Sequence, residues 1–248
     1  MRISRIKWRF SITRLPRLRA SSSDRWATSS IPAGTLWLVA GILFLAAEAI
    51  AAAGFPDYSY AIDYISELGI PCGGGAGAGQ ICSPRAGVMN AGFIVSGILF
   101  VLGALAFTRA ARTRGKAGAF LLLPLASIHA IGLVLVGLVH AGSREIAAGT
   151  YPLHVIGAGM AILGGNAAIV AASILTRRLG APLAFGMIGA FLGGLGLLSL
   201  ALLVASGHGG TAILPNGALE RGSVYSIAIW EILAGLVLLA DTGKMPDA

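Results

Sequence analysis

Six long apolar runs constrain the fold of this chain more than any other feature. Each run is long enough for a helix to cross the hydrocarbon core of a membrane, which takes about 20 residues. Hydrophobic residues make up 56% of the 248 residues and charged residues only 11%, so a soluble fold would lack the polar residues to cover its surface. We therefore expect an all-α bundle of six transmembrane helices. The runs cover residues 33–53, 87–108, 117–140, 153–176, 182–205 and 222–240.

Basic residues are distributed unevenly between the two sides of this bundle. Of the 18 Lys and Arg residues, 15 lie in the terminal segments or in the second and fourth connections, whereas Arg85, Arg144 and Arg221 lie in the other three connections. By the positive-inside rule, both termini are cytoplasmic and the connections that contain these three arginines are external. The topology thus accounts for the net charge of +8, and we expect no nucleic-acid partner.

This topology divides the chain into three segments. We expect a basic, disordered cytoplasmic segment over 1–32, the membrane domain over 33–240 and a cytoplasmic tail over 241–248. The first segment has no apolar central region and is therefore not a cleavable secretory signal. Its Arg- and Ser-rich composition also fits a transit peptide, a polybasic segment attracted to anionic lipid, or a mis-assigned translation start.

The first external connection, about 54–86, carries most of the polar residues outside the spans. Ala61, Tyr64, Ile65 and Leu68 recur at helical spacing, which predicts a short amphipathic helix over 59–68 lying on the external membrane surface; an irregular loop is the alternative. We predict that this connection and the start of the second run form an external recognition element. Its residues are Asp57, Asp63, Tyr64, Ser66, Glu67, Gly69 and Asn90.

The only two cysteines, Cys72 and Cys82, flank the glycine-rich sequence GGGAGAGQI in the same connection. On the external side of a membrane, disulfides persist. A bridge across so short and flexible a segment would stabilise the fold by about 2–3 kcal/mol through lost chain entropy. We predict a Cys72–Cys82 disulfide, and a redox-active pair is less favoured because the spacing is not that of a C-x-x-C motif.

Small residues recur four apart in two of the apolar runs. Gly189 and Gly193 form a GxxxG motif, and Gly157, Ala161 and Gly165 form a similar row in the fourth run. Such rows let helix backbones approach closely. They serve either packing within the chain or the face of a homodimer, and the sequence leaves both open.

Two acidic residues, Glu48 and Glu231, lie inside apolar runs. An intramembrane carboxyl group is costly and normally faces the bundle interior with a partner. His129 and Asn166 lie at about the depth of Glu231, so we predict an intramembrane polar cluster of these residues. It is either a proton or cation relay, or a hydrogen-bonded pin that fixes the register of the helices.

Three histidines lie near the external ends of the runs. His140, His154 and His208 could converge on a divalent metal ion such as zinc, together with an external carboxylate. The chain has no H-E-x-x-H motif and no nucleophile elbow, so the expectation of a metal site rests on the placement of these histidines alone. We expect no other cofactor.

The stretches DYISELG, SPRAGVMNAGFIVSGILF, LVLVGLVHAGSRE and HVIGAGMAILGGNAAIV resemble a family of prokaryotic six-helix membrane proteins, the domain of unknown function DUF998. The likeness extends over about 35–240 and implies the fold and a location in the bacterial plasma membrane, but no activity. The Ile-Ser-acid-x-Gly stretch is more distantly similar to the DRAM/Sfk membrane proteins, which are associated with membrane-lipid organisation. The elements that carry the resemblance are 64–69, Met89, Asn90, His154 and Asn166.

Three functions fit these features. The first is a non-enzymatic role in membrane or envelope organisation, in which the external loop meets lipid headgroups or an envelope partner. The second is a proton-coupled transporter that uses the Glu231 and His129 depth, and the third is an outward-facing metal-dependent hydrolase. The broken helices typical of many transporters and a compact ligand motif are both missing, which favours the first.

Overall fold

The computed structural model describes residues 22–73, 81–113, 121–178, 183–207 and 213–242. Within these ranges the chain is all-α, as predicted, and contains no β-strand beyond one isolated bridge between Pro71 and Ser83. The helices are α1 (Ser22–Ala52), the 3-10 helix η1 (Ile65–Gly69), α2 (Ala86–Thr113), α3 (Leu122–Leu138), α4 (Ser143–Ala147), α5 (Tyr151–Arg178), α6 (Leu183–Gly207) and α7 (Asn216–Thr242).

Five of the described helices, α1, α2, α5, α6 and α7, are long and apolar enough to cross a membrane. The apolar helix α3 has 17 residues, and residues 117–120, which begin the predicted third span, lie outside the described residues. The chain is therefore a multi-pass membrane protein by the length and composition of its helices. The number six and the orientation in the membrane stay predictions.

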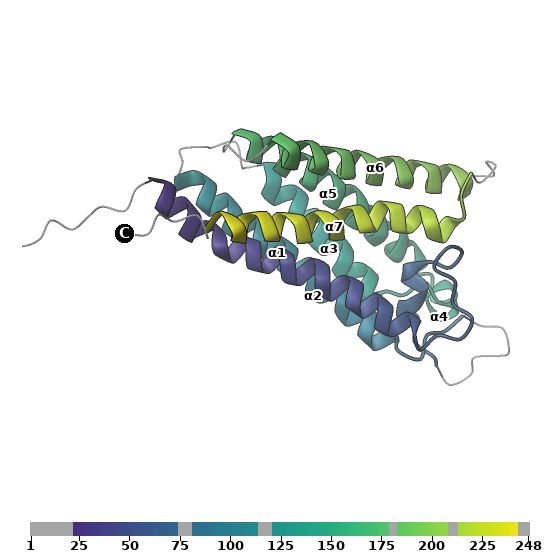
Figure 1. The fold of residues 1–248 in the computed structure, drawn as a ribbon. Coiled ribbons are helices and arrows are strands. Elements are labelled where there is room, and N and C mark those ends of the chain that lie inside the picture. Colours follow the sequence, from purple (N-terminus) through teal and green to yellow (C-terminus); the bar gives the residue numbers. More distant parts are fainter. Residues whose placement is uncertain (1–21, 74–80, 114–120, 179–182, 208–212, 243–248) are drawn as a thin grey trace, which may run out of the picture.

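The contacts between the six longer helices form a closed ring in chain order. Each helix packs against the next, α7 closes the ring by packing against α1, and α5 also contacts α7. The start of α1 and the end of α7 lie at one end of the bundle, whereas η1 and α4 lie at the other (Figure 1). The connections that contain Arg85 and Arg144, and Arg221 near the start of α7, are thus at the end with η1 and α4.

Aromatic side chains fill the centre of the ring. Trp37 of α1 packs against Trp230 of α7 and Phe107 of α2, with ring centroids 5.0 and 5.4 Å apart. The indole N–H of Trp37 donates a hydrogen bond to the backbone oxygen of Phe100 over 3.2 Å. Large apolar side chains such as Phe191 of α6 face outward, where a lipid environment would cover them without energetic cost.

The small residues of the predicted rows lie at contacts between helices of the same chain. A Cβ atom added to Gly132 of α3 would come within 2.3 Å of the Ala161 backbone nitrogen of α5, and one on Gly189 of α6 would lie 2.0 Å from Ser173 Oγ of α5. The α5 row thus packs on α3, and the GxxxG motif of α6 packs on α5. A homodimer is left untested by these contacts.

Helix α1 begins at Ser22 and continues through Pro32, so residues 22–32 of the predicted N-terminal segment are helical. Residues 1–21 of that segment, and residues 243–248 of the predicted C-terminal tail, lie outside the described residues.

The prediction of an amphipathic helix over 59–68 is wrong. The chain makes turns before Tyr64 and then the short 3-10 helix η1, whose Ile65 and Leu68 side chains are buried against the bundle. The backbone N–H of Ile65 bonds to Glu220 and the oxygen of Ile62 to Gly217, both in α7. Hydrogen bonds to a distant helix therefore replace the local bonds that an α-helix would need.

Candidate functional site

Arg221 lies at the start of α7, at the end of the bundle that carries η1 and α4, and bonds to several segments there. Its guanidinium is buried, with 7% of the residue exposed. Nε donates a hydrogen bond to Glu48 Oε1 of α1 over 3.0 Å, and Nη2 lies 3.0 Å from the same oxygen. The intramembrane carboxylate Glu48 is thus paired, as a buried charge requires.

The same guanidinium fixes the first connection to the bundle. Nη1 donates to the backbone oxygens of Asp63, over 2.8 Å, and of Tyr60, and Nη2 donates to the Tyr58 hydroxyl. The Arg221 Cζ atom also lies 4.9 Å from the centre of the Tyr60 ring and 5.5 Å from that of Tyr58. The Arg221 side chain therefore joins α1, α7 and the first connection. An arginine suits this role because its guanidinium carries five N–H donors in a fixed geometry.

Tyr58 extends this network within the connection. Its hydroxyl accepts from Arg221 and donates to the backbone oxygen of Tyr64 over 3.0 Å. Burial raises the pKa of Tyr58, so the hydroxyl keeps the proton that it donates.

Glu220, the neighbour of Arg221, accepts a hydrogen bond from the backbone N–H of Ile65. The free N–H groups in the first turn of α7 are satisfied as well, because Gly217 N donates to Ile62 O over 3.1 Å and Ala218 N to Ala61 O over 2.9 Å. The start of α7 and residues 57–69 thus form one hydrogen-bonded unit, which we call the cap.

The predicted recognition residues of the cap mostly bond to the cap itself. Asp63 Oδ2 accepts from Ser59 N over 2.7 Å, and Glu67 Oε2 accepts from Tyr64 N over 3.3 Å. Burial, with repulsion from Asp63, raises the pKa of Glu67. Burial likewise raises the pKa of the Tyr64 hydroxyl. Ser66 is half-buried, and Asp57 is exposed in a left-handed turn with φ 59°.

A second network begins where the cap meets α2. Asn90 Nδ2 donates to Gly69 O over 2.9 Å and lies 3.1 Å from His140 Nε2. His140 Nδ1 lies 3.2 Å from Glu145 Oε1. Because the Asn90 amide nitrogen can only donate, His140 Nε2 accepts from it, and Nδ1–H donates to the carboxylate. A Cβ atom at Gly69 would lie 2.4 Å from Asn90 Oδ1, so a larger residue there would have to displace the Asn90 side chain.

An open cleft of about 360 Å³ adjoins this network at the ends of α3 and α5. Its polar side chains come from the α4 region and its apolar ones from the helix ends. Leu138 and Leu153 are 63% and 46% exposed, so the apolar wall is continuous with the outward surface of α3 and α5. The lining residues are Leu138, Val139, His140, Arg144, Glu145, Ala148, Thr150 and Leu153.

The predicted metal ligands do not form a cluster in the described part of the chain. His140 bonds to Asn90 and Glu145, and His154 Nδ1 lies 2.7 Å from Val139 O. Within that part no group of three His, Cys, Asp or Glu side chains is arranged to hold a metal ion. His208 lies outside the described residues, so the three-histidine site stays a prediction.

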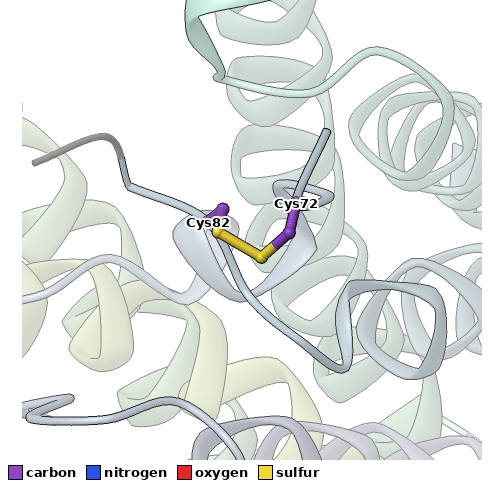
Figure 2. The surroundings of a disulfide bond; sticks show 2 residues. All are labelled: Cys72 and Cys82. Atoms are coloured by element: carbon purple, nitrogen blue, oxygen red, sulfur yellow. A yellow bond between two sulfur atoms is a disulfide. The ribbon is translucent and has the colours of Figure 1, made fainter. Parts of the chain in front are cut away.

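The predicted disulfide between Cys72 and Cys82 is present (Figure 2). The Cα atoms of the pair are 4.8 Å apart. Beside it, the backbone N–H of Ser83 donates to Ile70 O over 2.8 Å. The bond joins Cys72, which follows η1 closely in the chain, to Cys82, which precedes α2.

The structure brings together two of the four residues predicted to form the intramembrane cluster. His129 of α3 and Glu231 of α7 line one cavity of about 30 Å³. Asn166 does not line it, and its Nδ2 donates instead to Ile162 O and Ser223 O over 2.9 and 3.0 Å. Glu48 pairs with Arg221.

Sequence analysis missed Arg221, Glu220 and Tyr58 as members of the site. A signal for Arg221 was present, because Glu48 requires a cation and three arginines lie in the predicted external connections. To choose among these three arginines, one has to know that α7 packs on α1. Arg221 and Glu48, which meet there, are 173 residues apart in the sequence.

Comparison with known protein families matches residues 38–237 to the family described as protein of unknown function, DUF998. Searches of curated proteins and of solved structures gave no match, and the more distant similarity to DRAM/Sfk proteins stays a prediction. The family match spans most of the chain and includes the cap, both networks and the cavity. This multi-pass membrane protein therefore belongs to the DUF998 family.

Proposed function

We propose that this protein acts without catalysis at the external face of the bacterial plasma membrane, with both termini in the cytoplasm, and helps to organise the membrane or envelope. The observation that carries the proposal is the cap, which buried Arg221 ties to Glu48 and to the backbone of the first connection. This anchoring holds the first connection in one conformation against α1 and α7. A fixed surface binds a partner without the cost of ordering it first.

The charge distribution supports the external location of the cap. The end of the bundle with η1 and α4 carries Arg85, Arg144 and Arg221. The other 15 basic residues lie in sequence within 2–25, 109–116 and 177–178, which include the last turns of α2 and α5, or at Lys244. This asymmetry is the one that the positive-inside rule associates with an external face.

The cleft supports a lipid headgroup as the ligand. Its volume, about 360 Å³, is that of a small-molecule site. Arg144 is exposed at the cleft and can bind a phosphate group, while Leu138 and Leu153 offer an apolar wall for the start of an acyl chain. The polar and apolar parts meet at the helix ends, the level at which the headgroups of a bilayer lie.

The proposal is tested in cells that lack the protein, by envelope permeability to a dye and by lipid distribution between the leaflets. We expect both to change, and wild-type protein to restore them. Arg144→Gln should fail to restore them, whereas Arg112→Gln, the same loss of charge on an exposed residue at the other end of the bundle, should succeed. Normal permeability and normal lipid distribution without the protein would contradict the proposal.

A further inference from the structure

The cavity lined by His129 and Glu231 lies within the helix ring, where α1, α2, α3, α5 and α7 all contribute to its wall. Most of that wall is apolar, with Phe44, Leu133 and Ile227 among its residues. An apolar cavity of this kind would stay empty. This cavity differs from a purely apolar one because the ionisable side chains of His129 and Glu231 also line it.

His129 presents a hydrogen-bond acceptor within this cavity. Its Nδ1 lies 2.6 Å from the backbone oxygen of Ala161, which can only accept, so Nδ1 carries a proton and donates it. In the neutral imidazole the other nitrogen, Nε2, then has a free lone pair. The ring is held in place by Phe100, whose centroid is 4.5 Å away.

Glu231 presents a carboxyl oxygen without a partner. The residue is buried, with 3% exposed, and Oε1 has no hydrogen-bond partner among the described residues. A buried carboxyl group is stable only when its oxygens are bonded. The cavity adjoins this carboxyl group.

The other charged groups described on the helices around the cavity are engaged elsewhere, and the Tyr225 hydroxyl of α7 bonds to Glu48. On α1 and α7, Glu48 pairs with Arg221 and Glu220 bonds to Ile65. Arg221 is ten residues from Glu231 on α7, about 15 Å along a helix. On α5, His154 bonds to Val139, and the arginines of α2 are exposed at its far end. His129 and Glu231 are thus the two titratable groups that line the cavity.

We propose that this cavity is a proton-binding site, in which Glu231 and His129 share one proton through a single water molecule. The volume of about 30 Å³ holds one water, which needs at least two polar partners. The Glu231 hydroxyl donates to the water, and the water donates to His129 Nε2. When the Glu231 proton passes to the water and a proton of the water passes to His129 Nε2, the products are a carboxylate and an imidazolium. The number of protons in the site does not change. The proposal is independent of the external role above.

The test is infrared spectroscopy of the full-length protein in lipid nanodiscs at neutral pH. We expect a carboxylic-acid C=O band that shifts in heavy water. Glu231→Gln should abolish the band, and His129→Leu should move it to higher frequency because the hydrogen-bonded chain is broken. Glu145→Gln, which removes a carboxyl group at the cleft instead, should leave the band in place. A purely structural role for Glu231 would not couple its band to His129.

Three results would overturn the proposal: no such band in wild-type protein, a band that survives Glu231→Gln, or a band that does not respond to His129→Leu. If Glu231→Gln does not fold, nitrogen-labelled histidine in wild-type protein provides a second measurement by NMR. The His129 signals, identified by their loss in His129→Leu, are expected to be those of a neutral ring with Nδ1 protonated and Nε2 accepting a hydrogen bond. A His129 Nε2 signal typical of a nitrogen without a hydrogen bond would then refute the shared proton.

Discussion

Arg221 bonds to a carboxylate and to backbone oxygens that lie more than 150 residues earlier in the chain. Taking a guanidinium out of water is costly, and the pairing with Glu48 offsets that cost only while both charges are present. At the residue scale, the cap therefore depends on the integrity of this pair.

Arg221→Met should lower the free energy of unfolding by about 3–5 kcal/mol, because it leaves Glu48 buried without a counter-charge. The double variant Glu48→Met with Arg221→Met should recover part of that loss, because no charge is then left unpaired, although the bonds of Arg221 to the cap stay absent. Denaturant titration in detergent measures both, with Arg85→Met as an exposed control that should cost about 1 kcal/mol or less. A double variant no more stable than Arg221→Met alone would show that the charge pair is not the cause.

Glu67 gives the cap a dependence on pH. Burial and repulsion from Asp63 raise the pKa of Glu67 in the folded protein above its ordinary value of 4.5, so folding favours the protonated carboxyl group. The stabilising contribution of this group is therefore present at low pH and is lost as the pH rises through the folded pKa. Glu67→Gln should melt at a higher temperature than wild-type protein at neutral pH, and the difference should shrink on acidification. A difference that is constant with pH would contradict this assignment.

Close helix contacts decide the architecture at the scale of the elements. At Gly132 of α3 the nearest atoms to an added Cβ are backbone atoms of α5, at 2.3 to 2.8 Å, and backbone cannot move aside as a side chain can. The two helices would have to separate along their contact.

Gly132→Ala should therefore destabilise the bundle by roughly 1–3 kcal/mol. Gly159→Ala in α5 is the matched control, because an added Cβ there meets no atom within 4 Å. It should be neutral or stabilise the helix by up to about 1 kcal/mol. Thermal unfolding of the two variants compares them directly, and equal melting temperatures would refute this account of the α3 and α5 contact.

The Cys72–Cys82 bond limits the freedom of the first connection. Thiol titration of the denatured, unreduced protein should detect no free thiol, and two after reduction. Replacing both cysteines with serine should lower the free energy of unfolding by about 2–3 kcal/mol. Two thiols that react without reductant would contradict the presence of the bond.

Sequence patterns predicted the elements within the bundle better than those outside it. A run of apolar residues makes a helix in a membrane because its backbone has no other partner there, and α1, α2, α5, α6 and α7 follow that rule. In the cap, Ile65 and Leu68 have helical spacing, yet the backbone N–H of Ile65 bonds to Glu220, 155 residues away. No local pattern records such a partner, so the predicted helix over 59–68 was wrong.

At the scale of the whole molecule, the sequence indicated which residues are buried but not which helices are neighbours in the ring. Hydropathy identified Glu48, Glu231 and His129 as buried polar residues, because each interrupts an apolar run. It could not show that α7 closes on α1, which gives Glu48 its partner, nor that Asn166 faces α6 and α7 and not the cavity. Depth along a helix is readable from sequence, whereas the direction of a side chain around the ring is not.

The central claim is that the cap and the cleft lie on the external side of the membrane. Its most direct test is the labelling of single cysteines in intact cells with a maleimide that cannot cross membranes, in protein whose native cysteines are replaced by serine. Arg144→Cys, at the cleft, should be labelled in intact cells, and Arg112→Cys, at the other end of the bundle, only after the cells are permeabilised. Labelling of Arg112→Cys but not of Arg144→Cys in intact cells would contradict the orientation and, with it, the proposed external function.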